Sequence, residues 1–305
     1  MSKSFTCIDN NCPSKDNDDY NCAHASGGDG GVVQCVDKWA NDKFSYFDRY
    51  LGATRKARAK YVKNGNAVYI DLFSGPGQCR IKNIQEEIPG GALRASKLQE
   101  APFNRIILND LSANNVKAIK QRIKNAEVQN GDANTVVDAI VKDLLSAQYD
   151  KLHFVFLDPF SPANLKFQTI KSLASLKRVD IMINFPIGPI RRNYKTWLKK
   201  DGTILDEFLG TADWRQAVQG VSESAFCNNM IDIYYSQLKK IGFPEEGLGI
   251  IDEKGNSYLG ANIAAVRNSK NVLLYYLILA SKHKLAANIW QSILKTDPSG
   301  QKYFF

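Results

Sequence analysis

The sequence predicts an α/β fold, with a mostly parallel sheet, helices on both of its faces and an antiparallel hairpin at its C-terminal end. Between residues 67 and 186, five runs predicted to be strands alternate with helical patterns, which is typical of parallel strands joined by helices. Four of these runs end in an acid and the fifth ends in Asn. Two later apolar runs, 258–266 and 272–280, flank a polar turn and predict the hairpin.

The first apolar run leads into a tight glycine turn. Residues 67–73 are mostly apolar, as expected for a parallel strand buried on both faces, and Asp71 lies near the carboxyl end of this run. Gly75 and Gly77 then permit a close backbone approach. A strand followed by an acid and glycines is where α/β sheets bind adenosine-containing cofactors, and a plain Gly-Pro-Gly turn is the alternative interpretation of the motif by itself.

The spacing of this turn favours S-adenosylmethionine over NAD. It is D-x-x-x-G-x-G, which differs from the dinucleotide pattern G-x-G-x-x-G. An acid near the first turn can meet the ammonium group of S-adenosylmethionine, and this cofactor has no pyrophosphate for the turn to hold. The sequence therefore predicts S-adenosylmethionine as the cofactor.

The second and third runs supply two further acids. Asp110 ends the second run and can accept hydrogen bonds from both ribose hydroxyls, with Asn109 as the alternative if the strand ends one residue earlier. Asp132 follows the third run and can accept from the adenine amino group. Each acid alone has a second interpretation as the N-cap of the next helix. Together the strand ends predict the cofactor-binding residues Asp71, Phe73, Gly75, Gly77, Asp110, Asp132 and Ala133.

Several segments resemble one protein family. YIDLFSGPG, IPGGALRAS, NGDAN, FVFLDPFS and DIMINFPIGPIRRNY are similar to sequences of the TcmP family, the three-Cys-motif partner proteins, over roughly residues 38–296. The resemblance implies a Rossmann-like class I methyltransferase fold and S-adenosylmethionine as cofactor. It also implies association with a separate cysteine-motif partner protein, which carries the three cysteines of the family name. It implies no particular substrate.

The fourth apolar run ends at a candidate catalytic site formed by Asp158, Pro159 and Phe160. This segment is similar to the Asp-Pro-Pro-aromatic tetrad of amino-group methyltransferases, in which the carboxylate and a proline carbonyl accept from an exocyclic amine and the aromatic ring stacks on the base. Phe160 replaces the second proline and Ser161 replaces the aromatic residue, which weakens the assignment to adenine or cytosine amines. Methyl transfer mainly requires a positioned nucleophile and a group that manages its proton. A strand-ending turn with a capping aspartate is the alternative.

The chain is basic, with a net charge of +9 and a pI of about 9.1, which is compatible with a polyanionic partner. Residues 49–65 contain six bases and no acid, and residues 181–200 contain five bases and no acid, with Tyr194 and Trp197 interleaved. Basic residues interleaved with aromatic side chains suit nucleic-acid binding. The alternative is a solvated helix face with Trp197 in the core. The predicted nucleic-acid-binding residues are Arg191, Arg192, Tyr194, Lys195 and Lys199.

The N-terminal segment, residues 1–31, is polar and rich in glycine near its end. Cys7, Cys12, Cys22 and Cys35 have the spacing C-x4-C-x9-C-x12-C. Four thiolates satisfy a tetrahedral zinc ion, and so short and polar a segment cannot form a core unaided. The paired C-x2-C pattern of common zinc motifs is missing, so a loosely packed tail with reduced thiols is the alternative to a zinc site.

The remaining residues, 32–305, are expected to form the methyltransferase-like domain, with a basic insertion at about 187–225. Residues 33–63 are expected to be largely helical because their apolar residues form a helical stripe. No run of 18 apolar residues occurs, so we expect no membrane partner. The N-terminus lacks the apolar core of a signal peptide, and we expect a cytoplasmic location.

Three functions fit the sequence. The first is an S-adenosylmethionine-dependent methyltransferase that acts on a nitrogen of nucleic acid and works with a partner protein. The second is a partner subunit that binds S-adenosylmethionine or nucleic acid without transferring a methyl group. The third is a small-molecule or protein methyltransferase. The basic residues after the fifth apolar run favour nucleic acid over a small apolar substrate.

Overall fold

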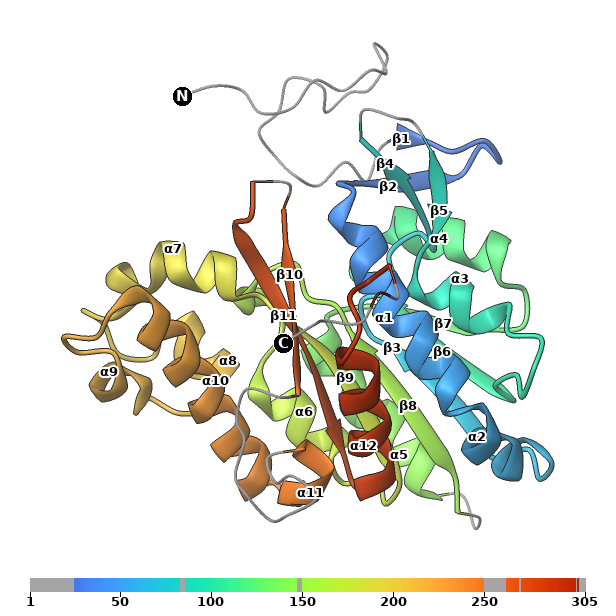
Figure 1. Ribbon diagram of the computed structural model, residues 1–305. Helices are drawn as coiled ribbons and strands as arrows, with labels where there is room; N and C mark the ends of the chain where they lie inside the picture. Colours follow the sequence, from blue (N-terminus) through green and yellow to red (C-terminus); the bar gives the residue numbers. More distant parts are fainter. Residues whose placement is uncertain are drawn as a thin grey trace. The chain divides into compact units, whose positions relative to one another are not determined.

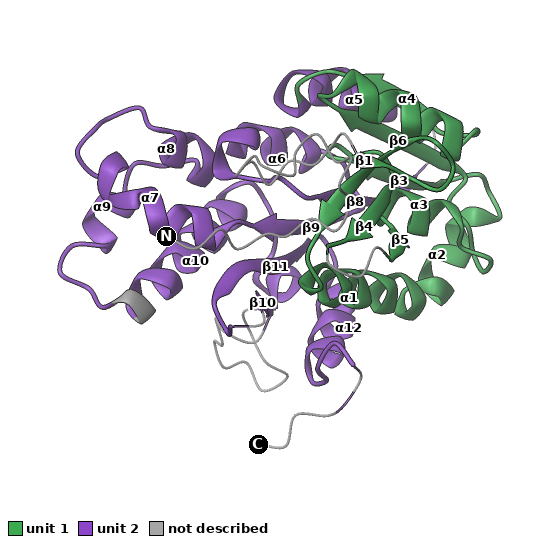
Figure 2. Ribbon diagram, turned by 90° about the horizontal axis from the view of Figure 1, so that it is seen from above, with its two compact units in different colours: residues 1–132 green, residues 133–305 purple. Residues whose placement is uncertain are grey.

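The computed structural model describes residues 25–82, 86–146, 150–249, 262–268, 270–299 and 301. The chain divides into two compact units, residues 1–132 and residues 133–305, which Figure 2 draws in different colours. Each unit has its own buried strands and its own covering helices, and each is described by itself.

Unit 1 contains three parallel strands: β3 (Ala67–Asp71), β6 (Arg105–Asp110) and β7 (Glu127–Asn130). All five residues of β3 are buried, as its apolar sequence predicts. The strands are covered by α3 (Gly91–Ser96), which packs against β3, and by α4 (Ala113–Arg122), which packs against β6 and β7. The α4 helix begins where the Ser112 hydroxyl accepts from the Asn115 N–H, a side-chain cap that satisfies one helix-end donor.

A second, smaller sheet belongs to the same unit. Its strands are β1 (Ala25–Ser26), β2 (Val32–Val36), β4 (Gln78–Ile81) and β5 (Glu87–Pro89), in the order β1-β2-β4-β5. The β2 and β4 strands are parallel, whereas the other two pairs are antiparallel. The antiparallel pair β1–β2 forms an N-terminal hairpin. The β4 strand directly follows the glycine turn, so this sheet joins the N-terminal hairpin to that turn.

The expected helix over residues 33–63 is wrong at its start. Residues 32–36 form the β2 strand, and the helices are α1 (Trp39–Ala53) and α2 (Arg55–Val62). Residues 32–36 are rich in valine, which suits a strand, and they pair with β4, more than 40 residues away in sequence. The apolar stripe on α1 is confirmed, because its side chains Phe44, Phe47, Tyr50 and Leu51 are buried.

Unit 2 begins with α5 (Ala133–Ser146) and contains the parallel strands β8 (Leu152–Leu157) and β9 (Val179–Phe185). Between them lie the short helix η1 (Pro162–Asn164) and α6 (Phe167–Leu173). The predicted hairpin is confirmed in its described part as β10 (Ile263–Arg267) and β11 (Leu273–Ser281), and β11 runs antiparallel to β9. Residues 258–261 of the first predicted strand lie outside the described residues. The final helix, α12 (Lys284–Leu294), packs against β11.

The described part of the segment between β9 and the hairpin contains helices joined by turns. It forms α7 (Ile187–Trp197), α8 (Ile204–Leu209), α9 (Trp214–Ala217), α10 (Glu223–Lys240) and α11 (Glu245–Leu248). Figure 1 shows α7 to α10 as one group of helices. Their core is aromatic: Tyr234 stacks on Phe208 with ring centroids 5.4 Å apart and meets Phe185, at the end of β9, edge-on at 5.0 Å.

The large sheet has seven strands in the order β10-β11-β9-β8-β3-β6-β7, mostly parallel, with helices around it. This arrangement confirms the predicted α/β class, including the C-terminal antiparallel hairpin that distinguishes a methyltransferase sheet from a dinucleotide-binding one. Within the described part of the chain, no helix is both long and apolar enough to cross a membrane.

Candidate functional site

The glycine turn after β3 is held by the acid that precedes it. Asp71 is only 2% exposed, and its two carboxylate oxygens accept from the Tyr69 hydroxyl and the Phe73 N–H, each at 3.0 Å. The first contact fixes the carboxylate against its own strand. The second bends the chain out of the strand, which is the usual action of an aspartate at the start of a turn.

Asp110, at the end of β6, is bonded to the same turn. Its Oδ2 accepts from the Gly75 N–H at 2.9 Å, while its Oδ1 accepts from the Ser112 N–H at 2.8 Å and from Asn115 Nδ2 at 3.0 Å. One carboxylate therefore joins the glycine turn to the start of α4. Because the carboxyl ends of parallel strands meet at one edge of a sheet, two acids far apart in sequence reach one turn.

Asn109 has a different position from its neighbour. Its side chain is fully buried, and Nδ2 donates to the carbonyl of Leu72 at 3.1 Å and to that of Gly131 at 3.0 Å. It therefore ties together the ends of β3 and β7. Because β6 ends at Asp110 and not one residue earlier, the condition for Asn109 as the alternative is not met, and Asp110 stays the predicted ribose ligand.

The two glycines of the turn differ in what surrounds them. Both have positive φ, +57° at Gly75 and +80° at Gly77, a backbone region that favours glycine. A Cβ at Gly77 would lie 2.4 Å from Cδ1 of Ile119 in α4, so Gly77 permits close helix packing. A Cβ at Gly75 would lie 3.3 Å from Oε1 of Gln34 in β2. A side chain at Gly75 would therefore enter the space beside the polar end of Gln34.

The other predicted cofactor residues have varied surroundings. Phe73 is half-buried beside the turn, and Asp132 is exposed at the end of unit 1. Ala133 is buried and begins α5 of unit 2. Their assignment to the cofactor stays a prediction.

In unit 2, the predicted catalytic residues follow β8. Asp158 is half-buried, Pro159 is buried, and the Phe160 ring is 61% exposed. Asn184, near the end of the neighbouring strand β9, donates from Nδ2 to Oδ1 of Asp158 at 2.7 Å. Oδ1 of Asn184 is buried and has no hydrogen-bond partner among the described residues. The sequence identified Asn184 only as a polar strand end, because nothing local to it indicates its contact with Asp158.

The predicted nucleic-acid residues lie on or just after α7. Arg192, Lys195 and Lys199 are exposed. Tyr194 is half-buried, and its ring lies against that of Phe226 with centroids 4.3 Å apart. Arg191 is half-buried and lies near Tyr276 of β11, where burial raises the pKa of the Tyr276 hydroxyl to about 12. Trp197 is half-buried, which is intermediate between the exposed position expected for nucleic-acid contact and the core position of the alternative.

The earlier basic run, residues 49–65, includes one structural arginine. Arg58 is buried, and its guanidinium donates to the carbonyls of Ala101 at 2.6 Å and Leu51 at 3.0 Å. It also lies over the ring of Phe103. A count of basic residues in this run therefore overstates the charge that it offers to a partner.

Most of the predicted zinc ligands lie outside the described residues, namely Cys7, Cys12 and Cys22. Cys35 is buried in β2. Within the described residues, no group of three or more His, Cys, Asp or Glu side chains could hold a metal ion. The zinc site stays a prediction that this structure neither places nor supports.

No protein-family model matches the chain, and no curated protein matches it. Several solved structures are similar at low identity. An O-methyltransferase from Bacillus cereus in complex with SAH has 10% identity and a TM-score of 0.41, with 79% of this chain and 81% of that chain covered. Trm1 from Pyrococcus horikoshii with S-adenosyl-L-methionine has 13% identity and a TM-score of 0.36, with 78% and 56% covered.

A precorrin-6y C5,15-methyltransferase from Geobacter metallireducens is also similar, with 11% identity, a TM-score of 0.32, and 75% of this chain and 87% of that chain covered. These scores are too low to assign a substrate or an activity. The methyltransferase interpretation therefore depends on the chain's own strand ends and on its strand order.

Proposed function

We propose that this chain is an S-adenosylmethionine-dependent methyltransferase that acts on a nitrogen of nucleic acid and works with a cysteine-motif partner protein. The observation that carries the proposal is the glycine turn after β3, where the Gly75 N–H donates to Asp110 at the end of the neighbouring strand β6 and Asp71 is fixed beneath the turn. The antiparallel β10–β11 hairpin supports a methyltransferase sheet over a dinucleotide-binding one.

The turn fits an adenosine cofactor by its shape and its donors. Gly75 is buried and has positive φ, and the space that a side chain there would enter is bordered by the polar end of Gln34. In this proposal Asp71 lies towards the amino-acid end of the cofactor, Asp110 binds the ribose and Asp132 binds the adenine. When bound, S-adenosylmethionine supplies an electrophilic methyl group on a sulfonium.

Asp158 is the proposed catalytic residue. Its carboxylate would accept a hydrogen bond from the target nitrogen and so orient the lone pair of that nitrogen. The Asn184 amide, 2.7 Å away, holds the carboxylate in one orientation. The exposed ring of Phe160 offers an apolar face on which a base can stack.

The choice of nucleic acid as substrate rests on charge. The exposed side chains of Arg192, Lys195 and Lys199 are available for phosphate contacts on a chain with a net charge of +9. A partner subunit that binds cofactor or nucleic acid without catalysis is the second candidate. It is favoured by Ser161, which stands where the tetrad has an aromatic residue and instead caps η1, accepting from the Ala163 N–H at 3.2 Å.

A methyl-transfer assay decides between these functions. The purified chain, with its partner protein present, would be given radioactive S-adenosylmethionine and fractions of DNA, RNA and protein. We expect transfer to a nucleic acid, and we expect Asp158→Ala to reduce it by at least about 100-fold, because orientation and proton handling contribute that much. Cofactor affinity should change by no more than a few fold.

Asp150→Ala is a matched control, because Asp150 is an exposed acid of the same unit that pairs with Lys177 and Arg178. It should retain full transfer. Tight cofactor binding with no transfer to any fraction would favour the non-catalytic subunit. Transfer to protein alone would favour the third function, and full transfer by Asp158→Ala would show that the catalytic residue lies elsewhere.

A further inference from the structure

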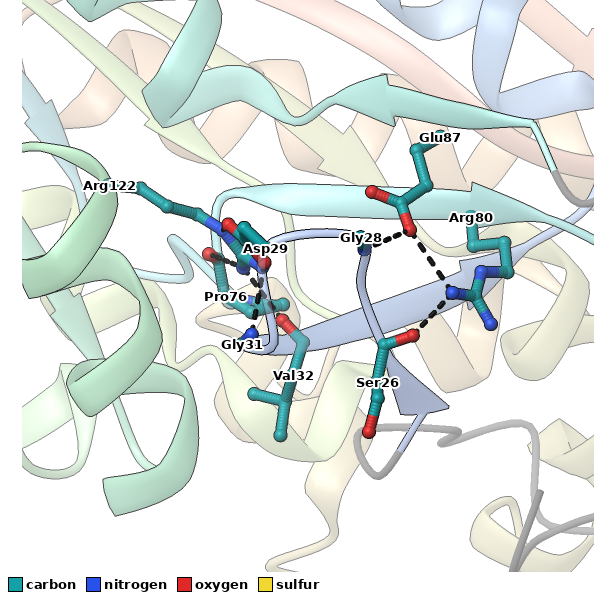
Figure 3. A network of polar contacts seen from close by, with 9 residues as sticks. All are labelled: Ser26, Gly28, Asp29, Gly31, Val32, Pro76, Arg80, Glu87 and Arg122. Atoms are coloured by element: carbon teal, nitrogen blue, oxygen red, sulfur yellow. Dashed lines mark hydrogen bonds and ion pairs between the residues drawn. The ribbon is translucent and has the colours of Figure 1, made fainter. Parts of the chain in front are cut away.

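Arg122, the last residue of α4, joins the N-terminal hairpin to the glycine turn (Figure 3). Its side chain is only 7% exposed. Nε and Nη2 donate to the two carboxylate oxygens of Asp29 at 2.7 and 2.6 Å, while Nη1 donates to the carbonyls of Val32 and Pro76, each at 2.7 Å. This set of contacts is called the Arg122 clamp. A bidentate guanidinium–carboxylate pair with two further carbonyl acceptors fixes both position and angle.

The loop that the clamp holds is the glycine-rich end of the N-terminal segment. Asp29 accepts from the Gly31 N–H at 3.0 Å, and Gly27 donates to the Gly31 carbonyl at 2.7 Å. A Cβ at Gly31 would lie 2.8 Å from Nη2 of Arg122, and one at Gly27 would lie 2.6 Å from Cγ1 of Val33. The glycines thus allow the loop to pack closely. This part of the segment, residues 27–31, is packed against the rest of unit 1.

A second contact holds the other side of the loop. Glu87 of β5 accepts through Oε1 from the Gly28 N–H at 2.9 Å and from Arg80 at 3.1 Å (Figure 3). Arg80 also donates to the Ser26 carbonyl. Arg122 therefore holds one side of the β1–β2 hairpin, and Glu87 and Arg80 hold the other side. Together these contacts fix the path of β2 past the glycine turn.

This path brings Gln34 to the turn. Gln34 is the central residue of β2 and pairs in register with Cys79 of β4, two residues after Gly77. Its Oε1 lies 3.3 Å from the point where a Cβ of Gly75 would be. A cofactor lying over Gly75 would enter the space that this carboxamide borders. The carboxamide offers two N–H donors and one carbonyl acceptor, which suits a ligand group that carries a carboxylate and an ammonium.

We propose that Gln34 is a further cofactor-binding residue, which contacts the amino-acid end of S-adenosylmethionine, and that Asp29 and Arg122 are positioning residues that hold β2 in place for this contact. The inference rests on the proposed cofactor site at Gly75. The hydrogen bonds from Arg122 lower the pKa of the Asp29 carboxyl to about 2, so the clamp keeps its ion pair at neutral pH.

Two ligands isolate the amino-acid end of the cofactor. S-adenosylhomocysteine carries the amino acid, whereas 5′-methylthioadenosine has the same nucleoside and thioether without it. By calorimetry, we expect Gln34→Ala to weaken S-adenosylhomocysteine binding about tenfold, the usual effect of one hydrogen bond to a charged group. Binding of 5′-methylthioadenosine should stay within about twofold. Gln99→Ala, at an exposed glutamine of the same unit, is the matched control and should change neither affinity.

The positioning role needs a separate readout. Arg122→Lys keeps the charge but removes the bidentate geometry, and Asp29→Asn removes the ion pair. Both should speed hydrogen exchange at residues 28–32 and should weaken S-adenosylhomocysteine binding more than 5′-methylthioadenosine binding. Because the clamp acts through Gln34, the double variant Asp29→Asn, Gln34→Ala should bind S-adenosylhomocysteine no more weakly than Gln34→Ala alone.

The possible failures are distinguishable. If the wild-type chain binds neither ligand, the proposed cofactor site is wrong and the inference falls with it. If it binds both, and Gln34→Ala weakens both equally or neither, the cofactor site stands and the role of Gln34 is overturned. Additive losses in the double variant would overturn the positioning role. Should Gln34→Ala fail to fold, the isosteric Gln34→Glu replaces it, and its carboxylate should weaken S-adenosylhomocysteine binding selectively.

Discussion

The glycine turn after β3 and the strand end after β8 each carry an aspartate at the end of an apolar strand, yet the two aspartates are used differently. In unit 1, Asp71 and Asp110 accept from backbone N–H groups of the turn itself. In unit 2, Asp158 is contacted by the side chain of Asn184 and is followed by the exposed ring of Phe160. The first two acids bond to the backbone of the turn, whereas Asp158 is bonded by a side chain of the neighbouring strand.

This difference fits the two ligands of the proposed function. A small cofactor with several polar groups gains from donors and acceptors that are already fixed, because less ordering is required when it binds. A nucleic acid is large, and proteins bind it over a wide area with exposed basic side chains and aromatic rings. The comparison predicts that unit 1 is sensitive to changes in its backbone, and that unit 2 is sensitive to removal of exposed side chains.

The largest effect should come from filling the turn of unit 1. Asn tolerates the positive φ of Gly75 better than other side chains, so Gly75→Asn adds a side chain at low backbone cost. We expect it to reduce S-adenosylhomocysteine affinity by at least about 100-fold, measured by calorimetry, because the cofactor needs this space. Gly65→Asn is the matched control, since Gly65 has φ +71° and nothing within 4 Å of its Cβ position. Undiminished binding by a folded Gly75→Asn chain would contradict the placement of the cofactor.

The next effect tests whether the strand ends of unit 1 are held rigidly. Asn109→Ala leaves the buried carbonyls of Leu72 and Gly131 without their donor. We expect a loss of about 2 kcal/mol in the free energy of unfolding, measured by urea denaturation. The control is Asn193→Ala, which removes an exposed contact to the Pro189 carbonyl on α7. If both variants change stability by less than about 0.5 kcal/mol, Asn109 is not the tie that its geometry indicates.

In unit 2, the Phe160 ring should matter for binding and not for stability. Phe160→Ala should reduce affinity for single-stranded nucleic acid about tenfold, since stacking of one base is worth that much. The urea midpoint should stay nearly unchanged because the ring is 61% exposed. Leu145→Ala, at another exposed apolar residue of this unit, should alter neither quantity. A marked loss of stability in Phe160→Ala would return the ring to a structural role.

The smallest effect concerns the basic residues of α7. Replacing Arg192 and Lys195 with Ala should weaken nucleic-acid binding a few fold, and the log–log salt slope should fall by about one to two units, one for each lost phosphate contact. Fluorescence anisotropy across a salt series measures both. The paired control replaces Lys239 and Lys240, two exposed bases at the end of α10. Equal slopes for the two double variants would mean that α7 presents only a solvated face.

The sequence by itself determined most strands of the large sheet and the apolar face of α1. Apolar runs ending in a polar residue predicted β3, β6, β8 and β9, and the structure confirms each of them. The apolar stripe of α1 is likewise buried at Phe44, Phe47, Tyr50 and Leu51. These features are local, because a strand or helix face is set by the spacing of residues within one segment.

Only the tertiary structure decided which segments meet. It made residues 32–36 a strand by pairing them with β4, and it joined Asp29 to Arg122 across 93 residues of sequence. It also gave neighbouring residues different surroundings. Asn109 is buried whereas Asp110 is not, and Gly77 packs on Ile119 whereas Gly75 lies beside Gln34. Local periodicity cannot contain such contacts, because their free energy depends on groups that approach one another only when the whole unit has folded.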